Sequence, residues 1–178
     1  MKKTLLSLAI ASLAAGQSVC AAVEKVYNEP DSVYIFSYAH PEDEGRSGLK
    51  FAWSPDGDKW LSVSDGFAYL KCDFGRWGAE KRMIKPLLEK AEDGRWYCRW
   101  QLTPSGKVWG TSHSSDLLKW APQQYVNAEK PAMPRLVTAR QIVLDKDTLN
   151  GYMQKVPYAD IEPVSYTHLR AHETDQYL

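Results

Sequence analysis

One stretch of sequence occurs twice, first as Ser54-Pro55-Asp56-Gly57-Asp58-Lys59-Trp60 and again, 60 positions later, as Ser114-Ser115-Asp116-Leu117-Leu118-Lys119-Trp120. Both copies follow the pattern S-x-D-x-x-K-W. An aspartate in this position favours a tight turn, because its short carboxylate accepts hydrogen bonds from the backbone N–H groups that follow. Asp56-Gly57 is in addition a strong hairpin signal. For both aspartates and for Trp60 and Trp120 we therefore expect structural roles, in turn formation and in packing between sheets.

Runs of alternating apolar and polar residues precede each copy of the motif. They cover residues 33–39 and 49–53 before the first copy, and residues 96–102 and 107–111 before the second. Such alternation is typical of half-buried β-strands. The repeated order of strand, loop, strand and turn is that of a propeller blade. The sequence thus predicts an all-β fold, a partial β-propeller of about two antiparallel blades within residues 23–130.

The character of the chain changes after Trp120. Several prolines indicate a linker, and residues 137–144 and 149–156 predict a β-hairpin that turns at Asp145-Lys146-Asp147. We assign residues 131–162 to this linker and hairpin, as part of a further blade or module. A helical pattern is weak everywhere, and in its one candidate stretch, residues 80–90, Pro86 interrupts it.

Composition excludes several classes of protein. The 178 residues contain 22 Lys and Arg against 22 Asp and Glu, so the formal net charge is zero. A non-specific nucleic-acid binder needs a basic face, and we expect no nucleic-acid partner. Aromatic residues make up 12% of the chain, which suits a β-rich fold and also a surface that stacks on sugar rings. No phosphate-binding loop, metal-ligand spacing or nucleophile elbow occurs, so we expect no metal and no cofactor.

The first 22 residues predict a secretory signal peptide. Lys2 and Lys3 are followed by an apolar stretch at residues 5–15 and by small residues up to Ala22. We therefore expect a periplasmic or extracellular protein. The alternative is a lipoprotein acylated at Cys20, although the residues before Cys20 fit that signal poorly. No other apolar run is long enough to predict a membrane span.

Export also bears on the cysteines in the middle of the chain. An oxidising compartment allows a disulfide between Cys72 and Cys98. The alternative is that Cys98, which lies in a Trp-rich strand candidate, is a buried thiol.

The C-terminal residues 163–178 have a different origin in our interpretation. Val164-Ser165-Tyr166-Thr167-His168-Leu169-Arg170-Ala171-His172-Glu173-Thr174 is similar to one reading frame of a transposase-type sequencing adapter. We therefore expect an artefact after Glu162, and a natural chain that continues into further blades. For this reason His168, His172 and Glu173 are not proposed as a metal site.

The blade motifs resemble those of the family 43 glycoside hydrolases, five-bladed propeller arabinosidases and xylosidases. The resemblance spans residues 32–124 and is carried by Gly48-Leu49-Lys50-Phe51-Ala52-Trp53-Ser54-Pro55-Asp56-Gly57, by Gly94-Arg95-Trp96-Tyr97 and by the second heptapeptide. It implies that the full-length parent hydrolyses arabinose- or xylose-containing plant glycans with paired carboxylates. It implies no cofactor.

The catalytic pattern of that family is only partly present. The family carries an aspartate that tunes the general acid in an Arg-Asp-Pro triplet, where this chain has Ile84-Lys85-Pro86. A lysine lowers the pKa of a neighbouring carboxyl group, whereas a general acid needs a raised pKa. For the catalytic base the resemblance points to Asp43, within Glu42-Asp43-Glu44; the alternative is a solvated acidic loop. The acid would come from a later blade, so we expect this fragment to be inactive.

Four residues are candidates for substrate binding. Trp77, between two glycines, is either a sugar-stacking platform or a core residue between blades. His113 either reaches a sugar hydroxyl or is an exposed turn residue. Lys85 and Trp53 are the other two candidates for substrate binding. Two functions remain open at this point: a glycosidase-like protein acting on a plant-type polysaccharide or oligosaccharide, and a non-catalytic propeller that binds glycan or supports a neighbouring domain.

Overall fold

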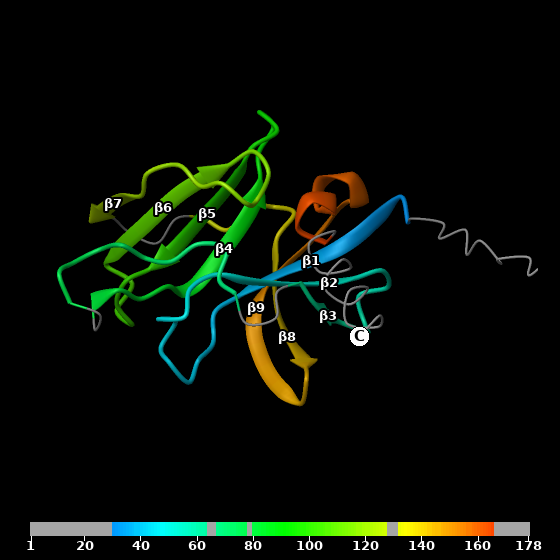
Figure 1. Cartoon of the computed structure of the whole chain (residues 1–178). Helices are drawn as coiled ribbons and strands as arrows, with labels where there is room; N and C mark the ends of the chain where they lie inside the picture. The colour runs from blue at the N-terminus through cyan, green and yellow to red at the C-terminus, as the bar shows by residue number, and fades with distance from the viewer. Residues whose placement is uncertain (1–29, 64–66, 78–79, 128–131, 166–178) are drawn as a thin grey trace, which may run out of the picture.

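The computed structural model describes residues 30–63, 67–77, 80–127 and 132–165 (Figure 1). The predicted signal peptide, Cys20 and residues 166–178 of the C-terminal tail lie outside the described residues. The strands of the described chain are β1 (Ser32–Tyr38), β2 (Lys50–Ser54), β3 (Leu61–Ser62), β4 (Ile84–Lys90), β5 (Trp96–Gln101), β6 (Val108–Ser114), β7 (Gln124–Asn127), β8 (Thr138–Leu144) and β9 (Asp147–Pro157). A 3-10 helix, η2 (Tyr158–Asp160), follows β9.

The strands form two antiparallel sheets, which lie side by side in Figure 1. One sheet has the order β3-β2-β1-β9-β8 and the other the order β4-β5-β6-β7. The all-β prediction, with sheets like those of a partial β-propeller, is confirmed. The predicted strands of the repeat are also confirmed to within a few residues at their ends, as β1, β2, β5 and β6.

The two sheets share one arrangement of strands. In the second sheet β4 lies beside β5, which is followed by β6 and β7; in the first, β9 lies beside β1, which is followed by β2 and β3. Strand β9 therefore holds in the first sheet the position that β4 holds in the second. The hairpin that we assigned to a further blade or module is hydrogen-bonded to the first sheet, with β9 paired to β1 from Ser32↔Pro157 to Ser37↔Tyr152.

The repeated turns form as predicted. The Asp56 carboxylate accepts hydrogen bonds from the backbone N–H groups of Asp58 and Lys59, at 2.8 and 3.0 Å. Asp116 accepts them in the same way from Leu118 and Lys119, at 2.9 and 2.8 Å. Both aspartates are therefore turn residues, because local hydrogen bonds use their carboxylates.

Strand β4 occupies the stretch in which only a weak helical pattern was visible. Its first residues are irregular: the pairing with β5 shifts between Ile84 and Leu87, and Lys85 has a φ of 49°. Pro86 is accommodated because β4 is the edge strand of its sheet and carries a bulge, where a missing N–H interrupts no ladder.

Two hydrophobic clusters form the core. The larger cluster joins residues of both sheets, among them Ile35, Phe51, Trp96 and Trp100, and it includes Val164. The smaller cluster, around Phe36 and Ile142, lies on the other face of the first sheet and holds the β8–β9 hairpin in place.

Cys72 and Cys98 are both buried free thiols, so the structure contains no bridge between them. Burial raises the pKa of the Cys98 thiol far above its ordinary value. This corresponds to the second alternative given above, a buried thiol in a Trp-rich strand.

Candidate functional site

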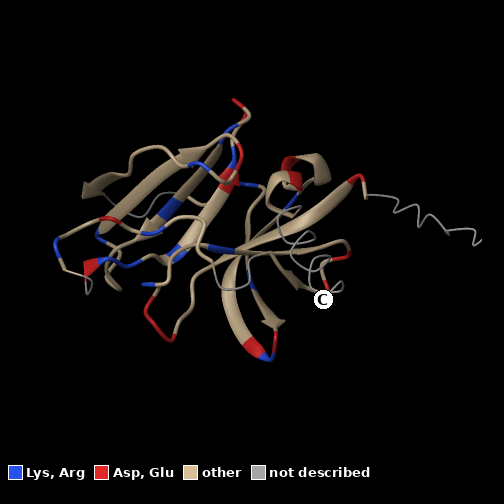
Figure 2. Cartoon of the chain, in the orientation of Figure 1, with Lys and Arg blue, Asp and Glu red and all other residues tan. Residues whose placement is uncertain are grey.

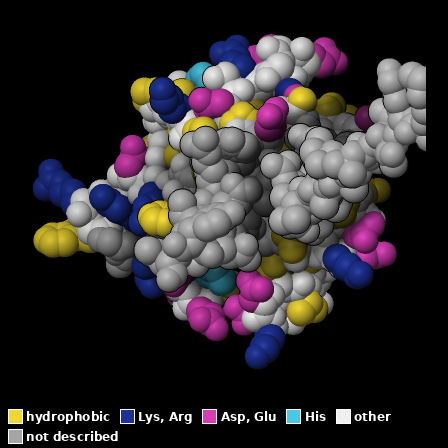
Figure 3. Space-filling view, turned by 45° about the vertical axis from the view of Figure 1, so that its right-hand side comes forward, with side chains coloured by type: hydrophobic (Ala, Val, Ile, Leu, Met, Phe, Trp, Pro, Cys, Tyr) yellow, Lys and Arg dark blue, Asp and Glu magenta, His cyan; other side chains and the backbone are white. Residues whose placement is uncertain are grey.

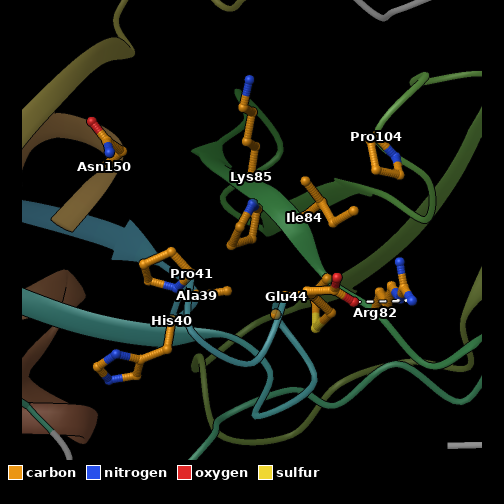
Figure 4. A pocket seen from close by; sticks show the side chains of 12 residues that line it. Ala39, His40, Pro41, Glu44, Arg82, Ile84, Lys85, Pro104 and Asn150 are labelled. Atoms are coloured by element: carbon orange, nitrogen blue, oxygen red, sulfur yellow. Dashed lines mark ion pairs between the residues drawn. The ribbon is translucent and has the colours of Figure 1, made fainter. Parts of the chain in front are cut away.

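A cleft of about 320 Å³ opens where the loop after β1 meets the beginning of β4 (Figure 4). The loop after β5 and the strand β9 complete its walls, through Pro104 and Asn150. Its apolar lining comes mainly from Pro41, Ile84, Pro86 and Pro104, and its polar groups come from His40, Glu44, Arg82, Lys85 and Asn150.

The loop after β1 is held tightly against β4. Gly45 accepts a hydrogen bond from the N–H of Met83 at 3.1 Å, and a Cβ at Gly45 would lie only 2.2 Å from the Met83 carbonyl oxygen. Only glycine fits here, because a Cβ would clash with Met83 and because the φ of Gly45 is 78°, which other residues rarely adopt. Glu44, next to it, therefore has a defined position at the edge of the cleft.

The Glu44 carboxylate is engaged by two guanidinium groups. Its Oε2 lies 2.9 Å from an Arg82 nitrogen and 2.9 Å from an Arg46 nitrogen. Figure 4 shows the ion pair with Arg82 on the side of the cleft away from Asn150. This carboxylate joins the loop after β1 to Arg82, in the segment just before β4.

Asp43, the predicted catalytic base, does not line this cleft. Its two carboxylate oxygens accept hydrogen bonds from the backbone N–H groups of Gly45, at 2.9 Å, and Ser47, at 2.8 Å. Burial alone would raise its pKa, but the hydrogen bonds from Ser47 and Gly45 outweigh burial, and the pKa lies below 3.8. In this structure Asp43 stabilises a turn.

Lys85 lies at the junction of two cavities. It lines the cleft described above and also a wider cavity of about 630 Å³ along the β8–β9 hairpin. Asn150 is the other residue that lines both, so the two cavities are neighbours that share two lining residues, and we call them together the double cleft. The wider part is bounded by Lys85, Met133, Ala139, Arg140, Gln141, Asn150, Gly151 and Tyr152.

The register of the hairpin shows which side chains face the wider cavity together. Gln141 pairs with Asn150 and Ala139 pairs with Tyr152, so these four side chains share one face. The Gln141 amide donates to Asn150 Oδ1 at 3.3 Å, which orients both amides. Burial raises the pKa of the Tyr152 hydroxyl above 10.0, so the phenol remains a neutral hydrogen-bonding group.

Arg140 belongs to the opposite face of the hairpin. Its guanidinium donates a hydrogen bond to Met153 Sδ at 3.7 Å and lies 3.8 Å from Asp58 Oδ1. Arg140 lines part of the wider cavity, but its guanidinium lies near Asp58 in the turn after β2.

The other predicted binding residues lie away from the double cleft. Trp77 lies in the segment between β3 and β4 and is 72% exposed, so it is not a core residue. His113 lies in β6 against the ring of Tyr97, with ring centroids 5.6 Å apart. Trp53 lies in β2 beside Tyr158, 6.0 Å between ring centroids. The structure brings Lys85 together with the loop that contains Asp43. Trp77, His113 and Trp53 line neither of the two cavities.

Asn150, Gln141 and Tyr152 are the site residues that the sequence did not suggest. They occur in an ordinary alternating hairpin, and no motif marks them. They reach Lys85 only because β9 pairs with β1, which is a contact between residues far apart in the chain.

The double cleft is poor in carboxylates among the described residues. Among the described residues that line it, Glu44 is the one carboxylate. Hydrolysis by two carboxylates needs a second group across the scissile bond.

In the described part of the chain no three His, Cys, Asp or Glu side chains are grouped as metal ligands. No helix among the described residues is long and apolar enough to span a membrane.

The surface carries charges of both signs. Lys and Arg are spread over both sheets and their loops, and acidic residues lie between them (Figure 2). On the face shown in Figure 3, hydrophobic side chains form separate patches among charged ones.

No protein-family model, curated protein or solved structure matches this chain. The resemblance to the family 43 glycoside hydrolases is therefore carried by the sequence motifs alone.

Proposed function

We propose that this chain is an exported, carbohydrate-active protein that binds plant-type oligosaccharides or polysaccharides in the double cleft. The observation that carries the proposal is that Lys85 and Asn150 line both of the two neighbouring cavities. One part offers an apolar proline surface, and the other offers amide groups beside the ring of Tyr152. A flat apolar surface with a few oriented hydrogen-bonding groups is what a sugar ring requires.

Binding without hydrolysis is the function that the described residues favour. Glu44 is engaged by two arginines and Asp43 by backbone N–H groups, so neither is placed as a base across from an acid. Hydrolysis of arabinose- or xylose-containing glycans remains the proposal for a longer parent chain, in which further blades supply carboxylates. The repeated blade motif supports that second proposal.

The binding proposal is tested by calorimetric titration of the full chain with xylo- and arabino-oligosaccharides. The informative variant is Asn150→Ala, which removes an amide that borders both cavities. Its matched control is Thr148→Ala, an exposed residue on the same face of β9, two positions nearer the turn. Loss of one or two hydrogen bonds predicts a roughly 3- to 10-fold weaker affinity for Asn150→Ala and no change for the control. Absence of binding, or equal affinity in both variants, would contradict the proposal.

The location of the protein is tested separately. Expression of the full chain in a Gram-negative host should give a periplasmic or secreted product cleaved near residue 22. A product that remains in the cytoplasm with its first residue intact would contradict export. A lipid adduct on Cys20 would support the lipoprotein alternative.

A further inference from the structure

The wider cavity contains a cation without a carboxylate partner in the described part of the chain. Some cations around the two sheets are paired, Arg82 with Glu44, Lys90 with Asp160 and Arg99 with Glu89. Exposed lysines such as Lys59, Lys107 and Lys146 make no ion pair with a described residue. Lys85 makes no ion pair with any described residue, although it is close to the Glu44–Arg82 pair in sequence. Figure 4 shows its side chain extending away from that pair. Its charge is therefore available to a ligand.

The backbone at Lys85 is unusual for a lysine. A φ of 49° lies in the left-handed region, which glycine and asparagine adopt far more readily. The position also coincides with the bulge in the β4–β5 ladder. Bulges redirect side chains, and strained backbone is concentrated at binding sites. A lysine at this strained position places an ammonium group at the junction of the two cavities.

The surroundings of Lys85 in the wider cavity favour an anion. The described residues that line this cavity include no aspartate and no glutamate. The neighbouring side chains are the hydrogen-bonded amides of Gln141 and Asn150 and the neutral hydroxyl of Tyr152. These groups can donate to oxygen atoms, and none of them repels a negative charge. The lining is thus complementary to an oxyanion attached to a polar, ring-shaped ligand.

We propose that Lys85 pairs with the acidic group of an anionic saccharide, so that the double cleft selects glycans carrying uronic acid residues over neutral ones. This inference rests on the proposed saccharide-binding function and specifies its substrate class. A hydrogen bond between an ammonium and a carboxylate is about twice as strong as one between neutral groups, which is the basis for selection. A sulfate ester presents the same chemistry, so the shared feature is an anionic substituent on a sugar ring.

The test compares four oligosaccharides of the same backbone. They are neutral xylotetraose, xylotetraose with one glucuronic acid branch, the same branched compound with its carboxyl reduced to an alcohol, and a sulfated xylotetraose. Each is titrated into the full chain at low and at high salt. We expect the uronate compound to bind at least about tenfold more tightly than its reduced form at low salt, and the difference to shrink at high salt because screening weakens exposed ion pairs. If the sulfated compound gains as much affinity as the uronate compound, Lys85 pairs with any acidic substituent. If the sulfated compound gains no affinity, Lys85 pairs with uronates specifically.

The variant that isolates Lys85 is Lys85→Asn, because asparagine tolerates the left-handed backbone and lacks the charge. The matched control is Lys146→Asn, an exposed lysine in the β8–β9 turn with a φ of 77°. Lys85→Asn should remove the preference for the uronate, measured as the ratio of its affinity to that of the reduced compound, and Lys85→Arg should retain the preference. The control should behave as the wild type, and thermal melts should show both variants folded.

The outcomes separate the two proposals. If none of the four compounds binds, the saccharide-binding function is wrong. If the neutral, reduced and acidic compounds bind with the same affinity, saccharide binding stands and the role of Lys85 is overturned. A preference for the uronate that persists in Lys85→Asn would likewise overturn it, since another cation would then be responsible.

Discussion

The hydroxyl of Ser37 in β1 donates a hydrogen bond to the backbone carbonyl of Pro86 in β4, at 3.1 Å across 49 positions of sequence. The bond is buried and joins the two sheets directly beside the bulge that carries Lys85. The same hydroxyl lies 3.4 Å from the carbonyl oxygen of Tyr152 in β9. Three strands from distant parts of the chain therefore meet at one side chain, next to the double cleft.

Replacing that hydroxyl should destabilise the whole chain. Ser37→Ala leaves a buried carbonyl without its partner, which costs about 1–3 kcal/mol of unfolding free energy. Chemical denaturation followed by tryptophan fluorescence measures the loss. The control is Ser115→Ala, an exposed serine in the second repeat, which should change the free energy by less than about 0.5 kcal/mol. Equal stability of the two variants would show that the bond between the sheets contributes nothing.

The close approach of β9 to β1 depends on Gly151. A Cβ at this position would lie 2.3 Å from the Ser37 carbonyl oxygen and 2.5 Å from the ring of Phe36. Gly151→Ala should therefore force the hairpin away from β1 at a cost of about 1–3 kcal/mol. Gly94→Ala is the comparison: there a Cβ meets nothing within 4 Å, and only the φ of 79° opposes it. Denaturation curves should show the larger loss for Gly151→Ala; the reverse order would contradict the packing of β9 on β1.

The repeated turns predict how stability depends on pH. Hydrogen bonds from the backbone of Lys59 and Asp58, together with the Ser54 side chain, lower the pKa of Asp56 from 3.8 to about 2. A carboxyl group whose pKa is lower in the folded state stabilises that state above its unfolded pKa. The contribution is lost as the pH falls through the folded pKa. The melting temperature should thus decrease between about pH 4 and pH 2, and part of the decrease comes from Asp56.

The variant Asp56→Asn checks this assignment. Asparagine retains an oxygen acceptor and does not titrate, so the decrease below about pH 4 should be smaller than in the wild type. Glu92→Gln, at an exposed position after β4, serves as the control and should keep the wild-type slope. Circular dichroism melts at a series of pH values supply the measurement. Parallel curves for Asp56→Asn and the wild type would mean that the turn carboxylate is protonated at the same pH in both states.

The exposure of Trp77 predicts that it can be removed without loss of stability. Its side chain is 72% exposed, so Trp77→Ala should change the unfolding free energy by less than about 0.5 kcal/mol. Trp100→Ala, at a position with 0% exposure, should cost about 3–5 kcal/mol. If Trp77 stacks on sugar rings, affinity electrophoresis in xylan gels should show less retardation of Trp77→Ala at unchanged melting temperature. Unchanged retardation would remove Trp77 from the set of binding residues.

The sequence was sufficient to predict the strands and turns of the repeat. Alternation places Trp96, Cys98 and Trp100 on one face of β5, and all three are buried. The hydrogen bonds of Asp56 and Asp116 reach only two or three residues along the chain, so a short motif contains all the groups that form the turn. Strand β4 escaped detection because Pro86 and the bulge interrupt its alternation.

The candidate site could be predicted from the sequence only in part. Lys85 was singled out, as was the acidic loop, although the structure places Glu44 rather than Asp43 at the cleft. Asn150 and Tyr152 carry no local signal, because a polar residue on the exposed face of a hairpin is ordinary.

Local physics thus accounts for the β-strands, the repeated turns and the all-β class, since side-chain alternation and short-range hydrogen bonds act within a few residues. The partner of β9 was decided only by the tertiary structure. An antiparallel edge can accept any strand of suitable pattern, and the choice of β1 depends on burial against Phe36 and on the room beside Gly151. That long-range choice brings Asn150 to Lys85 and creates the double cleft.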